Sequence, residues 1–206
     1  MQKVARLALI VIVLVLFPFT AGCSKEGNTI LPTETPTATP SASGAKVQII
    51  IYSDLQCISC YTLYSQIEPK IVEQYVMTGK VTLETRYLSL KGPASSLAAQ
   101  AILCAGDQGQ APKYRDNILA AWAKDGADAY ARDKLKSVAM ALGMDAKTFD
   151  GCLIDGKYLQ QLSYYTVEAG KASVETLPTI FINDVKIEGV KPWVIISQAI
   201  EEQLAR

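Results

Sequence analysis

Residues 54–61 read DLQCISCY and place two cysteines, Cys57 and Cys60, three positions apart. Directly before them, residues 46–52 form a short, β-branched, nearly continuous apolar run that predicts a strand covered on both faces. Directly after them, apolar residues recur every four positions to about Met77 and predict a helix with one buried stripe, which Pro69 is expected to interrupt and kink. The two thiols therefore lie where a strand leads into a helix, a context in which a Cys-x-x-Cys pair is typical of redox chemistry.

The start of a helix favours an ionised sulfur at Cys57. Unpaired backbone N–H groups and the positive end of the helix dipole both stabilise a negative charge there. Cys60 follows one turn later, faces inward and is expected to stay protonated until it reacts. We therefore expect Cys57 to attack or be attacked, and Cys60 to resolve the mixed disulfide.

Three other interpretations of this pair are open. Cys57 and Cys60 could form a structural disulfide, could be thiols without a role, or could bind zinc together with Cys104 and Cys152. The last two cysteines are isolated rather than closely spaced, which is unlike a second half of a zinc site. Redox chemistry is favoured, and no metal is expected.

Asp54 precedes Cys57 by three residues and also has two interpretations. Its carboxylate could accept protons during exchange, or it could be a solvated acid in a loop. The solvated acid is the favoured interpretation.

Composition predicts one globular domain with appendages. Half of the 206 residues are hydrophobic and 19% are charged, which is enough apolar material for a core. Twenty basic residues balance 20 acidic ones without a basic stripe, so nucleic acid is not an expected partner. The chain has no histidine, which excludes imidazole-activated nucleophiles and zinc sites that contain histidine.

The first residues predict an export signal. Two basic residues precede an apolar run from residue 7 to about 19, which is shorter than the roughly 20 residues of a membrane span. The run ends in Thr20-Ala21-Gly22-Cys23, which resembles the lipobox of bacterial lipoproteins, although Thr20 stands where that pattern usually has leucine. We expect a signal peptide over residues 1–22 and a lipid on Cys23; the alternative is an uncleaved anchor.

Residues 24–45 are rich in Pro, Thr and Ser and predict a flexible linker, because they can bury too little apolar area to offset the entropy of ordering. Residues 23–206 carry 18 basic against 20 acidic residues, so the lipid rather than a basic patch would attach the protein to the membrane. The expected location is outside the cytoplasmic membrane, where disulfides persist.

The rest of the chain completes an α/β pattern. Residues 81–87 alternate as a second strand, so that strand, helix and strand form a parallel crossover unit. Residues from about 93 to 170 show only helical spacings, with Gly143 suited to end one helix and Asp145 to cap the next. Strands follow at 179–182 and 185–187 around an Asn183-Asp184 turn, and Pro192 is expected in the first turn of a last helix.

Residues 175–179 read ETLPT and place a proline immediately before the strand at 179–182. Together with the strand entering Cys57–Cys60, the helical segment and the closing hairpin and helix, this motif resembles the thioredoxin-fold disulfide oxidoreductases of the DsbA type. The resemblance covers residues 46–206. It implies a β-α-β … β-β-α thioredoxin fold with an all-helical insertion.

The resemblance also implies roles for residues. Cys57 and Cys60 are the expected catalytic pair, and Leu177, Pro178 and Thr179 are expected to position the substrate, with a cis bond between Leu177 and Pro178. An extended polypeptide would add there as a strand. The expected activity is disulfide exchange with cysteine-containing polypeptides, oxidation preferred, by a monomer without a cofactor that a quinone-linked membrane protein reoxidises.

Two alternatives to an oxidase are open: a disulfide reductase or isomerase, and a non-catalytic module that binds a peptide or a metal. Many members of the family have proline, and often histidine, between the two cysteines, where this chain has Ile58 and Ser59. Stabilisation of the reduced form is what makes a dithiol a strong oxidant, so this dipeptide leaves the direction open.

Cys104 and Cys152 lie on apolar faces of predicted helices in the insertion. They are either two buried thiols or a bridge between helices. In an oxidising compartment the bridge is favoured, and it would stabilise the insertion without taking part in catalysis.

Overall fold

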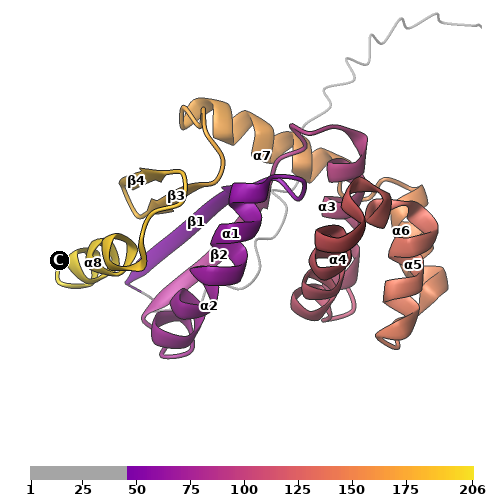
Figure 1. The fold of residues 1–206 in the computed structure, drawn as a ribbon, viewed down its shortest axis with the longest axis horizontal. Helices are drawn as coiled ribbons and strands as arrows, with labels where there is room; N and C mark the ends of the chain where they lie inside the picture. Colours follow the sequence, from indigo (N-terminus) through magenta and orange to yellow (C-terminus); the bar gives the residue numbers. More distant parts are fainter. Residues whose placement is uncertain (1–45) are drawn as a thin grey trace, which may run out of the picture. The chain divides into compact units, whose positions relative to one another are not determined.

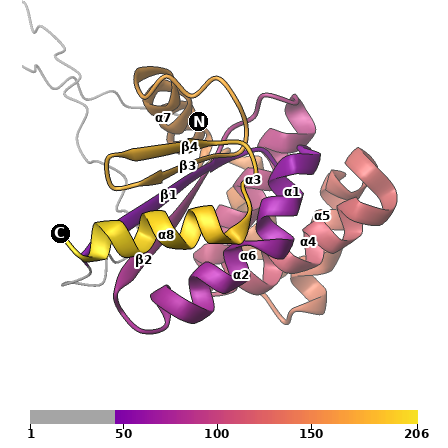
Figure 2. The same ribbon diagram turned by 60° about the vertical axis from the view of Figure 1, so that its left-hand side comes forward.

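The computed structural model describes residues 46–206; the predicted signal peptide, Cys23 and the linker lie outside the described residues. Helices cover both faces of a four-stranded mixed sheet (Figures 1 and 2). The strands are β1 (Val47–Ser53), β2 (Val81–Tyr87), β3 (Thr179–Ile182) and β4 (Val185–Glu188), in spatial order β2-β1-β3-β4. β1 runs parallel to β2 and antiparallel to β3, and β3 and β4 form a hairpin.

The helices follow the predicted order. They are α1 (Ile58–Gln66), α2 (Glu68–Ile71), the π-helical η1 (Val72–Val76), α3 (Pro93–Gly106), α4 (Ala111–Asp125), the 3₁₀-helical η2 (Gly126–Tyr130), α5 (Arg132–Ala141), α6 (Ala146–Ile154), α7 (Leu159–Lys171) and α8 (Trp193–Leu204). The predicted β-α-β … β-β-α order with an all-helical insertion is confirmed, the insertion being α3 to α7. Among residues 46–206, no helix combines the length and apolarity that crossing a membrane requires.

β1 is central and buried on both faces, which explains its nearly continuous apolar sequence. One face packs against α1, α2 and α8, where Ile49 and Ile51 of β1 join one hydrophobic cluster. The other face packs against the insertion, where Tyr52 joins a second cluster. Two cores therefore meet on opposite sides of the strand that leads into Cys57.

The helix predicted after Cys60 is interrupted, as its proline requires. Pro69 has no N–H to donate within the helix, and α1 ends at Gln66 before α2 restarts with Pro69 in its first turn. The chain then widens into η1, where the Met77 N–H donates to the Val72 carbonyl at 2.9 Å. These irregular turns keep the apolar stripe on one side. The stripe consists of Leu63, Ile67, Ile71 and Tyr75, all buried.

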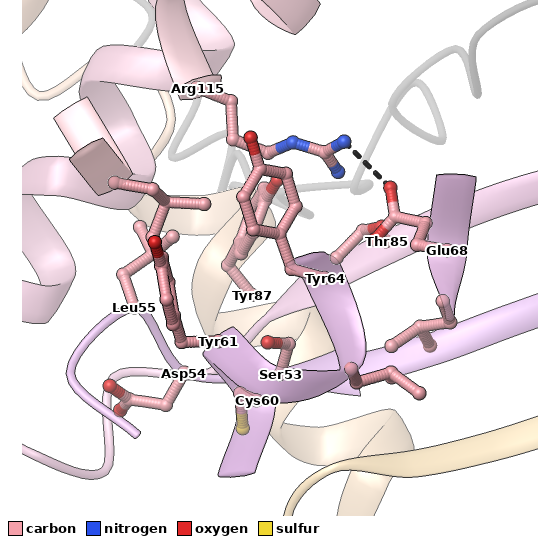
Figure 3. Close-up of a pocket in the computed structure, with 13 residues that line it drawn as sticks. Ser53, Asp54, Leu55, Cys60, Tyr61, Tyr64, Glu68, Thr85, Tyr87 and Arg115 are labelled. Atoms are coloured by element: carbon pink, nitrogen blue, oxygen red, sulfur yellow. Dashed lines mark ion pairs between the residues drawn. The ribbon is translucent and has the colours of Figure 1, made fainter. Parts of the chain in front are cut away.

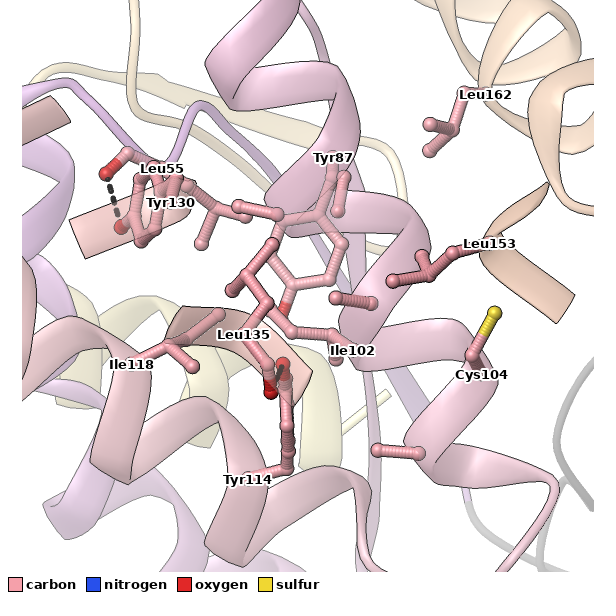
Figure 4. Packing of buried hydrophobic residues seen from close by; sticks show 14 of the residues in the cluster. Leu55, Tyr87, Ile102, Cys104, Tyr114, Ile118, Tyr130, Leu135, Leu153 and Leu162 are labelled. Atoms are coloured by element: carbon pink, nitrogen blue, oxygen red, sulfur yellow. Dashed lines mark hydrogen bonds between the residues drawn. The ribbon is translucent and has the colours of Figure 1, made fainter. Parts of the chain in front are cut away.

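The second cluster fills the insertion and extends to the sheet (Figure 4). Tyr114 and Phe149 pack with ring centroids 5.3 Å apart, and the Tyr114 hydroxyl donates to the Leu135 carbonyl at 2.9 Å. A disulfide between Cys104 and Cys152 joins α3 to α6 across 48 positions of sequence. Closing a loop of that length stabilises the folded chain by about 4 kcal/mol in the chain-entropy model. Because both sulfurs are bonded to each other, they cannot complete a zinc site with Cys57 and Cys60.

Local signals at helix and strand ends agree with the structure except at one proline. Gly143 has a positive φ of 73° after α5, and Asp145 accepts a hydrogen bond from the Thr148 N–H at the start of α6. Asn183 takes the left-handed conformation that the β3–β4 turn needs. Pro192 was predicted inside the first turn of α8, but it lies one residue before it in an extended conformation, and its carbonyl accepts from the Ile195 N–H.

Candidate active site

Cys57 is the N-cap residue of α1 and ends the loop that follows β1. Its backbone is extended, with φ −97° and ψ 116°, and its Sγ accepts a hydrogen bond from the Cys60 N–H at 3.3 Å. Both thiols are free, and their exposed fractions are 9% for Cys57 and 3% for Cys60. The helix start therefore supplies a donor to the more accessible sulfur, as expected from the strand-to-helix junction.

Cys60 has the properties of a resolving thiol. Burial raises the pKa of Cys60 to about 12, opposed in part by a hydrogen bond from the Asp54 backbone and reinforced by the neighbouring Cys57. At neutral pH this sulfur keeps its proton. The two thiols of the motif thus differ in their surroundings: Cys57 caps the helix, whereas Cys60 is enclosed.

The Leu177–Pro178 segment lies against Cys57, although 120 positions of sequence separate them. The peptide bond between Leu177 and Pro178 is cis, and the Leu177 carbonyl oxygen is 3.9 Å from Cys57 Sγ. The Pro178 carbonyl accepts from the Gly189 N–H at 2.8 Å, and Thr179 opens β3 beside Tyr52 of β1. Sheet pairing therefore brings the predicted substrate-positioning residues to the thiols.

Ser59 joins these two parts of the site. Its Oγ lies 3.1 Å from Cys57 Sγ and donates to the Leu177 carbonyl at 3.1 Å. No role for Ser59 follows from the sequence, because only the tertiary structure places Leu177 within reach of the first turn of α1.

Asp54 is not the solvated acid favoured from the sequence. It is only 1% exposed, and its carboxylate accepts from the Gln56 N–H at 2.8 Å, the Lys91 N–H at 3.0 Å and the Ser95 hydroxyl at 2.6 Å. These donors come from its own loop and from the segment that enters α3. The carboxylate therefore holds the loop before Cys57 in place. The sequence does not show this, because Lys91 and Ser95 are distant from Asp54 along the chain.

The helical insertion holds the same loop at a second point. The buried Tyr130 hydroxyl of η2 donates to the Leu55 carbonyl at 2.8 Å (Figure 4). The Gln56 side chain adds hydrogen bonds to Ser95 and to the Lys91 carbonyl. Residues distant in sequence therefore hold the loop, and no pattern in the sequence predicts these contacts.

A small cavity of about 20 Å³ lies beside Cys60 (Figure 3). Cys60 and Asp54 contribute to its lining, as does the buried ion pair between Glu68 and Arg115, whose N–O distance is 2.6 Å. Burial raises the pKa of the Glu68 carboxyl, and the Arg115 guanidinium opposes that shift. The pair was not predicted, since it forms only where α4 lies against α2.

Three exposed apolar side chains are sequence neighbours of residues of the site. Ile58 follows Cys57 and is 76% exposed, and Leu90 precedes Lys91 and is 61% exposed. Val190, also exposed, follows the Gly189 that bonds Pro178. Within residues 46–206, no group of three acidic, cysteine or histidine side chains is arranged to hold a metal ion.

A Cys-x-x-Cys pair at the start of the first helix of such a sheet defines a thiol–disulfide oxidoreductase of thioredoxin fold. The chain belongs to the thioredoxin family, whose model matches residues 39–202. Solved structures of DsbA-type proteins share the fold of this chain, as the predicted resemblance implies.

The chain is similar to oxidised BdbD from Bacillus subtilis, with 21% identity, a TM-score of 0.60 and coverage of 79% of this chain and 89% of that one. It is similar to a point variant of α-DsbA1 from Wolbachia pipientis, with 22% identity, a TM-score of 0.67 and coverage of 78% and 87%. It is also similar to the thiol-disulfide exchange protein α-DsbA2 of the same organism, with 20% identity, a TM-score of 0.63 and coverage of 77% of this chain and 82% of that one. These likenesses concern the fold. A comparison with curated proteins finds no match.

The raised pKa of Cys60 predicts a pH-dependent resolution step. In a mixed disulfide of Cys57 with glutathione, we expect the release of glutathione by Cys60 to accelerate by about tenfold per pH unit between pH 6 and pH 9, because the thiolate fraction rises by that factor below the pKa. Quenched-flow mass spectrometry of the adduct measures the rate. The Cys60→Ala variant should retain the adduct at every pH. A rate that levels off below pH 8 would contradict the assignment of Cys60 as a buried, protonated thiol.

Proposed function

We propose that this protein exchanges disulfides with secreted or membrane-exposed polypeptides through Cys57 and Cys60. The observation that carries the proposal is the pairing of a helix-capping thiol, whose Sγ accepts from the Cys60 N–H, with a buried thiol one turn later. The neighbouring Leu177 carbonyl adds a backbone acceptor beside the reactive sulfur.

In the oxidising direction, a substrate thiolate attacks Cys57 Sγ of the Cys57–Cys60 disulfide. The bond between the two enzyme sulfurs breaks, and Cys60 leaves as a thiolate that takes up a proton. A second substrate thiolate then attacks the substrate sulfur of the mixed disulfide, and Cys57 leaves as a thiolate. The substrate loses two electrons and two protons; the enzyme gains the two electrons and, at Cys60, one proton, and the other proton passes to solvent. Asp54 keeps the loop before Cys57 in place during these steps and is our candidate proton acceptor.

The substrate is an extended polypeptide that contains cysteine. Leu177, Pro178 and Thr179 present backbone at the edge of the site, where a strand can add by main-chain hydrogen bonds.

Oxidation is the preferred direction. The Cys60 N–H and the Ser59 hydroxyl both lie within hydrogen-bonding reach of Cys57 Sγ and stabilise the reduced form, which strengthens an oxidant. The protein acts as a monomer, without a cofactor, and a quinone-linked membrane protein reoxidises it. Reduction or isomerisation is the alternative for the same pair of thiols.

Substitution of the two cysteines tests the activity. Cys57→Ala should abolish disulfide exchange with a dithiol peptide, because the accessible sulfur is lost. Cys60→Ala should accumulate mixed disulfides with substrates, because nothing resolves them. Mass spectrometry and a peptide-oxidation assay measure both. Peptide oxidation that persists in Cys57→Ala would refute the role of Cys57. Peptide binding that is unchanged in Cys57→Ala, with no exchange in wild type, would identify a binding module instead.

Equilibration with glutathione tests the direction. We expect a reduction potential well above about −250 mV, because an oxidase must be more oxidising than the thiols it serves. The fraction of Cys57–Cys60 disulfide across a series of glutathione ratios measures it. A potential below that value would assign the protein to the reductases.

The location is extracytoplasmic, with the chain anchored by a lipid on Cys23 after removal of residues 1–22. The sequence Thr20-Ala21-Gly22-Cys23 and the linker that follows support this proposal. Cys23→Ala should abolish incorporation of labelled fatty acid and release the protein from the membrane fraction, whereas Cys57→Ala should remain lipidated. Equal fatty-acid labelling of the Cys23→Ala protein would refute the anchor. Sedimentation velocity in detergent checks the monomer.

A further inference from the structure

Ser59 lies between two groups that the proposed reaction uses for different purposes. Its Oγ is 3.1 Å from Cys57 Sγ, the reacting atom, and 3.1 Å from the Leu177 carbonyl oxygen, the expected acceptor for a substrate strand. The residue is half-buried in the first turn of α1, so the hydroxyl is held between the sulfur and the carbonyl oxygen.

The Ser59 hydroxyl has one hydrogen, and it cannot serve both neighbours at once. Because the Leu177 carbonyl can only accept, the 3.1 Å bond between Ser59 and Leu177 uses that hydrogen. A neutral Cys57 thiol can then donate its own hydrogen to Ser59 Oγ at 3.1 Å or to the Leu177 carbonyl at 3.9 Å. With the shorter of these contacts, a chain of two hydrogen bonds runs from Cys57 through Ser59 to Leu177.

Ionisation of Cys57 reverses the chain. A thiolate has no hydrogen to donate, so lone pairs of Cys57 Sγ and Ser59 Oγ face each other at 3.1 Å unless the hydroxyl turns. A hydrogen bond to an ionised acceptor is roughly twice as strong as one to a neutral acceptor, which favours the turn toward sulfur. The Leu177 carbonyl then loses its internal donor and is free to accept one from a peptide.

We propose that Ser59 is a positioning residue that couples binding of a substrate strand at the Leu177 carbonyl to stabilisation of the Cys57 thiolate; this inference rests on the proposed function. A substrate amide N–H replaces the Ser59 hydroxyl at Leu177, the hydroxyl turns to Cys57 Sγ, and the Cys57 proton leaves to solvent. No covalent bond of Ser59 changes. By linkage, a thiolate at Cys57 strengthens peptide binding by the same factor.

The first test is the equilibrium of the lipidated, full-length protein with glutathione at pH 7. Loss of the hydroxyl in Ser59→Ala should shift the equilibrium toward the Cys57–Cys60 disulfide by about tenfold, which is about 30 mV for a two-electron couple. Ser59→Thr keeps a hydroxyl and should stay within about threefold of wild type. Ser65→Ala is the matched control, because Ser65 is an exposed serine on the same helix that bonds only the Thr62 carbonyl.

The second test adds a cysteine-free decapeptide with alternating apolar and polar residues. In wild type, a saturating amount should shift the equilibrium toward the reduced form by about fivefold, the lower end of typical coupling between sites. In Ser59→Ala the shift should fall below about twofold. Two further decapeptides, N-methylated at alternate amides on one edge or the other, remove the donors from each edge in turn. At least one of them should lose the wild-type shift.

The outcomes separate the two proposals. A wild-type protein that does not exchange with glutathione refutes both. Normal wild-type exchange with a Ser59→Ala equilibrium equal to that of Ser65→Ala refutes the role of Ser59 alone. A decapeptide shift that is absent in wild type, or equal in wild type and Ser59→Ala, refutes the coupling. A shift present in wild type and Ser59→Thr but lost in Ser59→Ala supports it.

Discussion

The hydrogen bond from the Cys60 N–H to Cys57 Sγ is the interaction on which the site depends. It exists because β1 ends and α1 begins within a few residues, so that the first free N–H groups of a helix point at a sulfur. The sheet positions this junction: β1 is an interior strand, covered on both faces, and cannot shift without exposing two cores. Cys57 is therefore placed by a strand that lies between the two cores.

Rigidity around that junction comes from elements far away in sequence. The buried Asp54 carboxylate takes three hydrogen bonds from protein donors, and bonds to a charged acceptor contribute roughly 1.5–3 kcal/mol each. Tyr130 secures the next residue, Leu55, from within the insertion. The helical insertion, with the second cluster and its disulfide, thus supports the active-site loop directly.

The environment makes two identical side chains chemically different. Cys57 receives a backbone donor and has Ser59 and the Leu177 carbonyl beside it, whereas Cys60 is enclosed and its thiol is kept neutral by burial. The proposed order of reaction rests on this asymmetry: the capping sulfur is proposed to meet the substrate, and the enclosed sulfur to react second. The dipeptide between them, Ile58 and Ser59, contributes an exposed apolar side chain and a hydroxyl to the same small area.

Periodicity and motif spacing in the sequence were sufficient for the strand and helix order, the interrupted helix after Cys60, the Asp145 cap and the Asn183 turn. These are local features, set by hydrophobic patterning, by the missing N–H of proline and by side-chain capping. The tertiary structure decided what surrounds the thiols: the buried state of Asp54, the Tyr130 and Ser59 hydrogen bonds, and the Glu68–Arg115 pair. Each of these joins residues that are distant in the chain or depends on what covers them, so its partner exists only once the sheet has paired and the insertion has folded against the loop.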